Sequence, residues 1–132
     1  MVRNVASGLL LTTALAAVLT GCGANSMAPN RVLLSMAISP AVAAPAAGQV
    51  QFSATGTFSL PPSPDTVPFV SPYSGTWTIS NPKIATISQT GLATCVPGAA
   101  GTVIVSAIAS ANSAGPGQMS IAVSAAAKLT CP

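Results

Sequence analysis

A chain of 132 residues with four lysines and arginines, one acidic residue and no histidine offers little charge for chemistry or for binding charged partners. Its length suits one domain, and its few scattered cations lack the clustering that nucleic-acid binding requires. We therefore expect one small domain with an uncharged polar surface, a light core and no nucleic-acid partner.

The first 21 residues have the features of an export signal. Arg3 supplies a positive start, and the apolar run from Val5 to Leu19 is short for a transmembrane helix. An ordinary signal peptide or an amino-terminal anchor helix would show the same pattern, so the choice depends on the residues that follow.

The residues that follow, Leu19-Thr20-Gly21-Cys22, resemble the bacterial lipobox, in which a small residue precedes the cysteine at the cleavage site. In that motif the thiol takes a diacylglycerol, and the freed amine takes a further chain such as palmitate. Two or three chains hold a protein on a membrane durably, whereas one holds it only marginally. The resemblance implies an exported lipoprotein, anchored in the membrane through lipid on Cys22. Gly23, where inner-membrane lipoproteins often carry Asp, favours the outer membrane or the cell surface.

These features divide the chain into three parts. Residues 1–21 are predicted to be a lipoprotein signal peptide that is removed, and residues 22–31 a lipidated tether, in which Pro29 disfavours helix. Residues 32–132 are predicted to form the domain.

Short runs of alternating apolar and polar residues recur through this domain. The predicted inward-facing residues are Leu34, Met36 and Ile38; Val50, Phe52, Ala54, Gly56 and Phe58; Trp77 and Ile79; Val103, Val105 and Ala107; and Met119, Ile121 and Val123, with 125–130 as an extension of the last run. This period-two pattern indicates strands with one buried face and one solvated face. About seven such strands predict an all-β, two-sheet antiparallel β-sandwich.

Two connections stand out between these strands. Gln89-Thr90-Gly91 separates the runs at 84–88 and 92–95 and predicts a hairpin, with Gly91 in the positive-φ position. Five prolines at 61, 62, 64, 68 and 72 predict an extended, semi-rigid loop. This loop is either plain solvated surface or a contact loop in which Phe69 and Tyr73 touch a partner.

The order of motifs resembles one family. The stretch AGQVQFSATG at 47–56 resembles the second-strand motif of bacterial Ig-like group 2 domains. The later stretch resembles the most recognisable part of that family, with Trp77, Ser80-Asn81-Pro82, Ile84-Ala85-Thr86-Ile87, Gly91-Leu92-Ala93, Gly98 and Gly101-Thr102. The resemblance covers roughly Val32 to Val123. It implies an immunoglobulin-like sandwich that serves as a spacer or binding module and has no catalytic residues. The long Pro-rich loop and a cysteine at position 95 depart from the family pattern.

The cysteine count predicts one disulfide. Lipidation of Cys22 leaves Cys95 and Cys131 as a pair in an oxidising compartment. Their bridge would close a loop of about 36 residues and contribute roughly 4 kcal/mol in the chain-entropy model. The alternative is two buried or reactive thiols.

The chain lacks the residues that most catalytic and metal sites need. Asp65 is the one carboxylate side chain, so neither a carboxylate pair nor a calcium site can form. The absence of histidine excludes Ser-His-Asp and Cys-His catalysis and the usual four-ligand zinc site. A serine–lysine pair with Lys83 or Lys128 is formally possible, although no pattern places a serine beside either. We expect no enzyme activity, cofactor or metal.

Two functions remain open. The first is a lipid-anchored surface module that binds a glycan or a protein, in interaction or adhesion. The second is a structural or assembly subunit of the envelope that acts through protein–protein contacts in the periplasm, where sandwich edges support strand addition. A light core with few aromatic residues argues against the sizeable apolar pocket of a small-molecule carrier.

Overall fold

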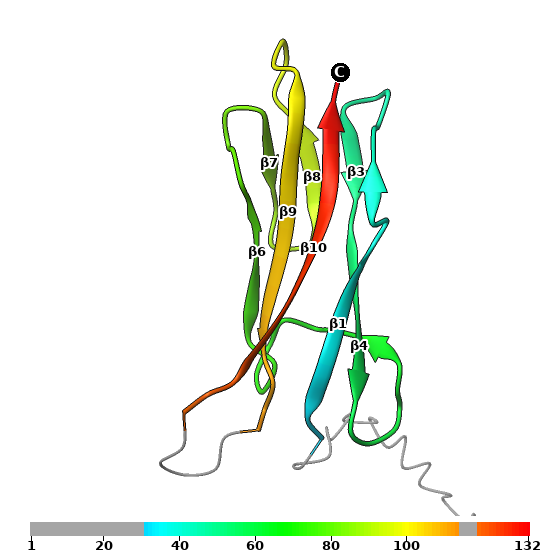
Figure 1. The fold of residues 1–132 in the computed structure, drawn as a ribbon, viewed down its shortest axis with the longest axis vertical. Helices are drawn as coiled ribbons and strands as arrows, with labels where there is room; N and C mark the ends of the chain where they lie inside the picture. The colour runs from blue at the N-terminus through cyan, green and yellow to red at the C-terminus, as the bar shows by residue number, and fades with distance from the viewer. Residues whose placement is uncertain (1–30, 114–118) are drawn as a thin grey trace, which may run out of the picture.

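The computed structural model describes residues 31–113 and 119–132, and every described element is a strand. The strands are β1 (Leu33–Ser39), β2 (Val42–Ala43), β3 (Gln49–Gln51), β4 (Ser53–Phe58), β5 (Asp65–Thr66), β6 (Gly75–Ile79), β7 (Ala85–Ile87), β8 (Leu92–Cys95), β9 (Gly101–Ser110) and β10 (Ala122–Cys131) (Figure 1). The predicted signal peptide, Cys22 and the predicted tether up to residue 30 lie outside the described residues.

The strands form two layers (Figure 1). One layer is a four-stranded sheet in the order β2-β10-β9-β6. The other consists of the sheets β1-β4-β5 and β3-β8-β7, which are continuous because β3 and β4 are interrupted only at Phe52. The predicted immunoglobulin-like β-sandwich is therefore confirmed.

One pairing departs from the antiparallel expectation. Strand β1 lies in one layer and pairs with β4, whereas β2 lies in the other layer and pairs parallel to β10. The two strands are separated only by Pro40 and Ala41. Because Pro40 cannot donate a backbone hydrogen bond, the first strand is divided there and its second part joins the opposite sheet.

The core follows the predicted alternation most closely in β4. Phe52, Ala54 and Phe58 are buried between the layers, and the polar residues that alternate with them are exposed. Trp77 of β6 closes the core from the opposite sheet and is also buried. Large aromatic side chains thus fill a space that is otherwise lined mainly by Ala and Val.

The predicted inward position of Leu34 is wrong. The pairing of β1 with β4 matches Leu33 to Phe58 and then Ser35 to Thr57, so β1 takes two steps where β4 takes one. This β-bulge shifts the alternation by one residue. Leu33 is buried in place of Leu34, which is 59% exposed.

The last strand begins later than predicted. Strand β10 starts at Ala122, so Met119 and Ile121 precede it and are exposed. The predicted extension is the main part of the strand, since Ala127, Leu129 and Cys131 are its buried residues. Every second residue faces inward as predicted, but the first two predicted residues, Met119 and Ile121, lie before the start of the strand.

The hairpin of β7 and β8 turns at Gly91, as predicted. Gly91 has φ of 83°, and its carbonyl accepts a hydrogen bond from the Phe52 backbone N–H at 2.9 Å. A Cβ at this position would lie 2.4 Å from the Phe52 carbonyl oxygen. The turn therefore needs glycine both for its conformation and for its close contact with the neighbouring strand.

We expect Gly91→Ala to lower the free energy of unfolding by about 2 kcal/mol or more, because a strained φ and a steric clash add together. Urea unfolding measures this loss. Gly98→Ala is the matched control, since Gly98 also has a positive φ (77°) but an added Cβ would meet nothing within 4 Å. It should lose only about 1 kcal/mol. Equal losses would mean that the contact with Phe52 is of no consequence.

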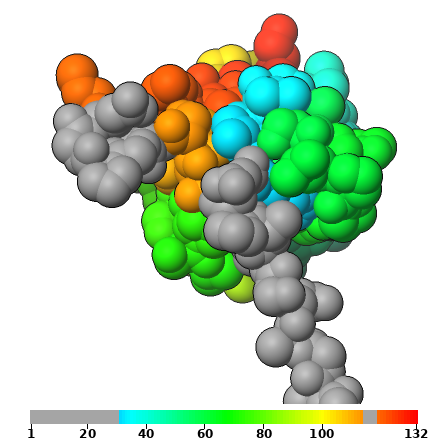
Figure 2. Space-filling model, turned by 90° about the horizontal axis from the view of Figure 1, so that it is seen from below, coloured from blue at the N-terminus to red at the C-terminus, as the bar shows by residue number. Residues whose placement is uncertain are grey.

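The two ends of the sandwich differ. At the amino-terminal end, the backbone N–H of Ser59 donates to Val32 and that of Leu33 donates to Ala111, whose own N–H donates to Ile121. These bonds bring the start of β1, the connection after β4 and the start of β10 to one end, where the cyan, green and orange segments adjoin in Figure 2. At the opposite end, which we call the disulfide end, lie the last residues of β8 and β10.

Candidate functional site

The Pro-rich loop does not present Tyr73 to solvent, so its prediction as a contact residue is wrong. The Tyr73 side chain is 0% exposed, and its ring meets that of Phe58 edge-on at 5.2 Å between centroids. The Tyr73 hydroxyl donates a hydrogen bond to the Arg31 carbonyl oxygen at 2.7 Å. Tyr73 is thus a core residue that ties the loop to the start of the domain.

Only part of the Phe69 side chain is available for contact with a partner. Its backbone has φ of 54°, a conformation that non-glycine residues rarely adopt. This turns its ring onto Trp77, with 5.3 Å between the centroids, and leaves it half-buried. Phe69 forms the wall of a cleft and does not project from the loop tip.

Arg31 holds the loop from the other side. Its guanidinium donates hydrogen bonds to the carbonyl oxygens of Leu60, at 3.1 Å, and Pro62. It also pairs with the Asp65 carboxylate at 3.2 Å and lies 3.6 Å above the centre of the Phe58 ring. Arg31 is buried, so this residue, predicted to be the last of the tether, packs against the domain.

A cleft of about 340 Å³ lies between this loop and the β7–β8 hairpin. Phe69 and Trp77 form its aromatic part, and the amides of Gln51 and Gln89 line it along with hydroxyl groups. The Gln51 amide donates to the Thr90 carbonyl oxygen at 2.7 Å, which holds it against the hairpin. Because Trp77 is buried, the half-buried Phe69 ring is the aromatic surface that this cleft exposes beside its neutral hydrogen-bonding groups. Sequence reasoning missed this cleft because its residues come from four separate segments.

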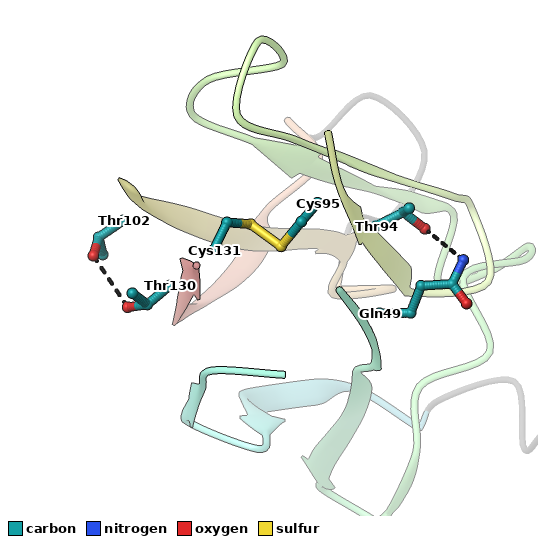
Figure 3. The surroundings of a disulfide bond; sticks show 6 residues. All are labelled: Gln49, Thr94, Cys95, Thr102, Thr130 and Cys131. Carbon is teal, nitrogen blue, oxygen red and sulfur yellow. Dashed lines mark hydrogen bonds between the residues drawn. A yellow bond between two sulfur atoms is a disulfide. The ribbon is translucent and has the colours of Figure 1, made fainter. Parts of the chain in front are cut away.

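The disulfide end carries a second hollow. Cys95 and Cys131, the predicted pair, are joined by a disulfide with 5.7 Å between their Cα atoms (Figure 3). Because Cys95 ends β8 and Cys131 ends β10, the bond links the two layers. Beside it lies a hollow of about 400 Å³ lined by small and neutral residues: Ala46, Ala47, Gly48, Gln49, Thr94, Cys95, Val96, Pro97, Gly98, Ala99 and Pro132.

The residues that line the two hollows carry no acidic, basic or histidine side chain. Asp65 is the one acidic residue of the sequence, and it pairs with Arg31 outside both hollows. Within residues 31–113 and 119–132, no group of three or more potential ligands could hold a metal ion. The arrangement supports binding of neutral groups through shape, hydrogen bonds and aromatic contact.

The two-layer fold and the buried Trp77 define a module of the immunoglobulin-like sandwich class. Residues 34–118 match the bacterial Ig-like domain (group 2), which is more than half of the chain. The chain belongs to this family, whose members are non-catalytic modules commonly found in surface or adhesion proteins. No curated protein matches the chain.

No helix capable of crossing a membrane occurs in the part of the chain that the structure describes. Cys22, the predicted lipidation site, lies outside that part.

Proposed function

We propose that this protein is a lipid-anchored module of the cell envelope that makes non-catalytic contacts at the cell surface. In this proposal, residues 1–21 are removed and Cys22 carries the lipid. Residues 22–30 are the tether, and the Ig-like domain runs from Arg31 to Pro132. The lipobox-like residues before Cys22 support the anchor, and membership of the Ig-like family supports the binding role.

One observation carries this proposal: the chain enters the domain at one end, and the disulfide lies at the opposite end. The chain runs into the domain at the amino-terminal end, where Arg31 is buried. The disulfide end lies at the other extreme of the long strands β9 and β10 (Figure 1). An anchor on Cys22 would therefore leave the disulfide end farthest from the membrane and most accessible to a partner.

The chemistry of the disulfide end suggests the type of partner. Its hollow is lined by alanine, glycine and proline, with Gln49 and Thr94 in a hydrogen bond of 3.3 Å at its side (Figure 3). The disulfide fixes this surface across both layers, which lowers the ordering cost of binding. The residues that line this hollow carry no charged side chain, which favours a neutral partner, either a glycan or a neutral patch of a protein.

We expect protease added to intact cells to degrade the tagged domain, and Cys22→Ala to release the domain from the membrane fraction. Immunoblotting of cell fractions measures both, with a periplasmic protein as the control for envelope integrity. Degradation of the wild type in intact cells would place the domain outside. A wild type that fractionates as soluble protein, like Cys22→Ala, would contradict the lipid anchor.

Protection of the wild type until the envelope is opened would favour the second function, that of an envelope assembly subunit. Among the described strands, β6 and β7 each lie at the edge of a sheet. Unpaired strand edges can accept a strand from another protein. Crosslinking within cells would then return a complex, and a monomer alone would contradict this function.

A further inference from the structure

Large apolar side chains gather at the amino-terminal end of the sandwich. Four exposed residues project from the connections there, and we call them the apolar end: Leu60 (42% exposed), Val70 (57%), Met119 (91%) and Ile121 (60%). Backbone hydrogen bonds from Ser59 to Val32 and from Ala111 to Ile121 tie two of these connections to neighbouring segments. A backbone hydrogen bond from Tyr73 to Val70 closes a turn within the third connection. Figure 2 views the domain from this side.

The apolar end carries no unpaired charge among its described residues. Arg31 and Asp65 neutralise each other at 3.2 Å. Lys83 follows β6 toward the disulfide end, and Lys128 lies three residues before Cys131. Desolvating this end would therefore leave no isolated charge to oppose the burial of its apolar groups. The neighbouring prolines 61, 62 and 64 also have no backbone N–H that would need a partner.

The length of the tether determines which end meets the membrane. Nine peptide units separate Cys22 from Arg31 (31 − 22 = 9), and they span at most about 30 Å when fully extended. Strand β10 has ten residues, and the nine steps between its first and last residues run for about 30 Å between the ends of the sandwich. Because Arg31 is fixed at the amino-terminal end, the disulfide end could reach the lipid only if the whole tether ran fully extended alongside the domain. The apolar end can reach the lipid with a relaxed tether, so the anchor favours contact at that end.

We propose that the apolar end docks on the surface of the lipid bilayer that holds the acyl chains of Cys22. This inference rests on the lipid anchor of the proposed function. Docking buries the four side chains at the boundary between headgroups and acyl chains, where apolar residues are favoured. The sandwich then stands upright, with its disulfide end directed away from the membrane.

Methionine oxidation tests this proposal directly, since a polar oxidant converts an accessible thioether to the sulfoxide. The full lipidated chain is placed on phosphatidylcholine vesicles, treated with chloramine-T, and the oxidation rate of Met119 is measured by mass spectrometry. Leu60→Asp with Val70→Asp weakens docking but retains Met119. The matched control is Ile104→Asp with Ile108→Asp, on the outer face of β9, where the two isoleucines have comparable exposure (41% and 42%).

We expect Met119 to be oxidised about tenfold more slowly in the wild type and the β9 control than in the apolar-end variant, as when nine in ten molecules are docked. Flotation with the vesicles reports the lipid anchor separately. Equal oxidation rates in chains that all float would overturn docking while leaving the anchor intact. A wild type that does not float would overturn the anchor and docking together. Protection that depends on protein density would overturn lipid docking in favour of a second copy covering this end.

Discussion

Replacing both Cys95 and Cys131 with alanine should lower the free energy of unfolding by about 4 kcal/mol. The disulfide joins residues 36 apart, so its loss restores conformational freedom to that segment in the unfolded chain. Small domains are stable by only about 5–15 kcal/mol, and this core is light. Urea unfolding followed through the fluorescence of Trp77, the single tryptophan, measures the loss.

A neighbouring pair of residues provides the control for this substitution. The hydroxyls of Thr102 and Thr130 lie 3.0 Å apart on β9 and β10, next to the disulfide (Figure 3). Thr102→Val with Thr130→Val removes an exposed cross-strand hydrogen bond and should cost at most about 1 kcal/mol. If the double alanine variant lost no more stability than the double valine variant, the covalent link would not stabilise the domain. The rigidity that we assign to the disulfide end would then have no basis.

The features that the sequence predicted well are those set by local pattern. The alternation of β4 places Phe52 and Phe58 in the core because the side-chain period of a strand is two. The hairpin turns at Gly91 because few other residues adopt its positive φ. Both signals are contained within a few residues, and no distant contact is needed to interpret them.

The features that the sequence predicted poorly depend on contacts between distant segments. The bulge that exposes Leu34 exists only in the register of β1 against β4. Composition indicates a tether and a Pro-rich loop but not that they interact, whereas Arg31 and Asp65 pair across 34 positions. The cleft at Phe69 and Trp77 likewise forms only when the loop folds back on the opposite sheet.

Tyr73 is the residue for which the prediction from composition and the structure differ most. As an exposed loop residue it could be replaced at a cost within about 0.5 kcal/mol. As a buried ring against Phe58, it should cost about 3–5 kcal/mol when replaced by alanine, because burial is lost and a cavity remains. Urea unfolding of Tyr73→Ala measures this loss. The matched control is Val70→Ala, three residues away in the same loop and 57% exposed, which should change stability by no more than about 0.5 kcal/mol.

Tyr73→Phe separates the ring from its hydroxyl. The ring stays against Phe58, while the hydrogen bond to the Arg31 carbonyl oxygen is lost, at a cost of about 1 kcal/mol. The Asn112 side-chain amide still donates to that oxygen at 3.1 Å, so the carbonyl is not left without a partner. A loss as large as that of Tyr73→Ala would show that the hydroxyl, and not the ring, secures the loop. A small loss would show that packing against Phe58 holds the amino-terminal end in the arrangement that carries the tether.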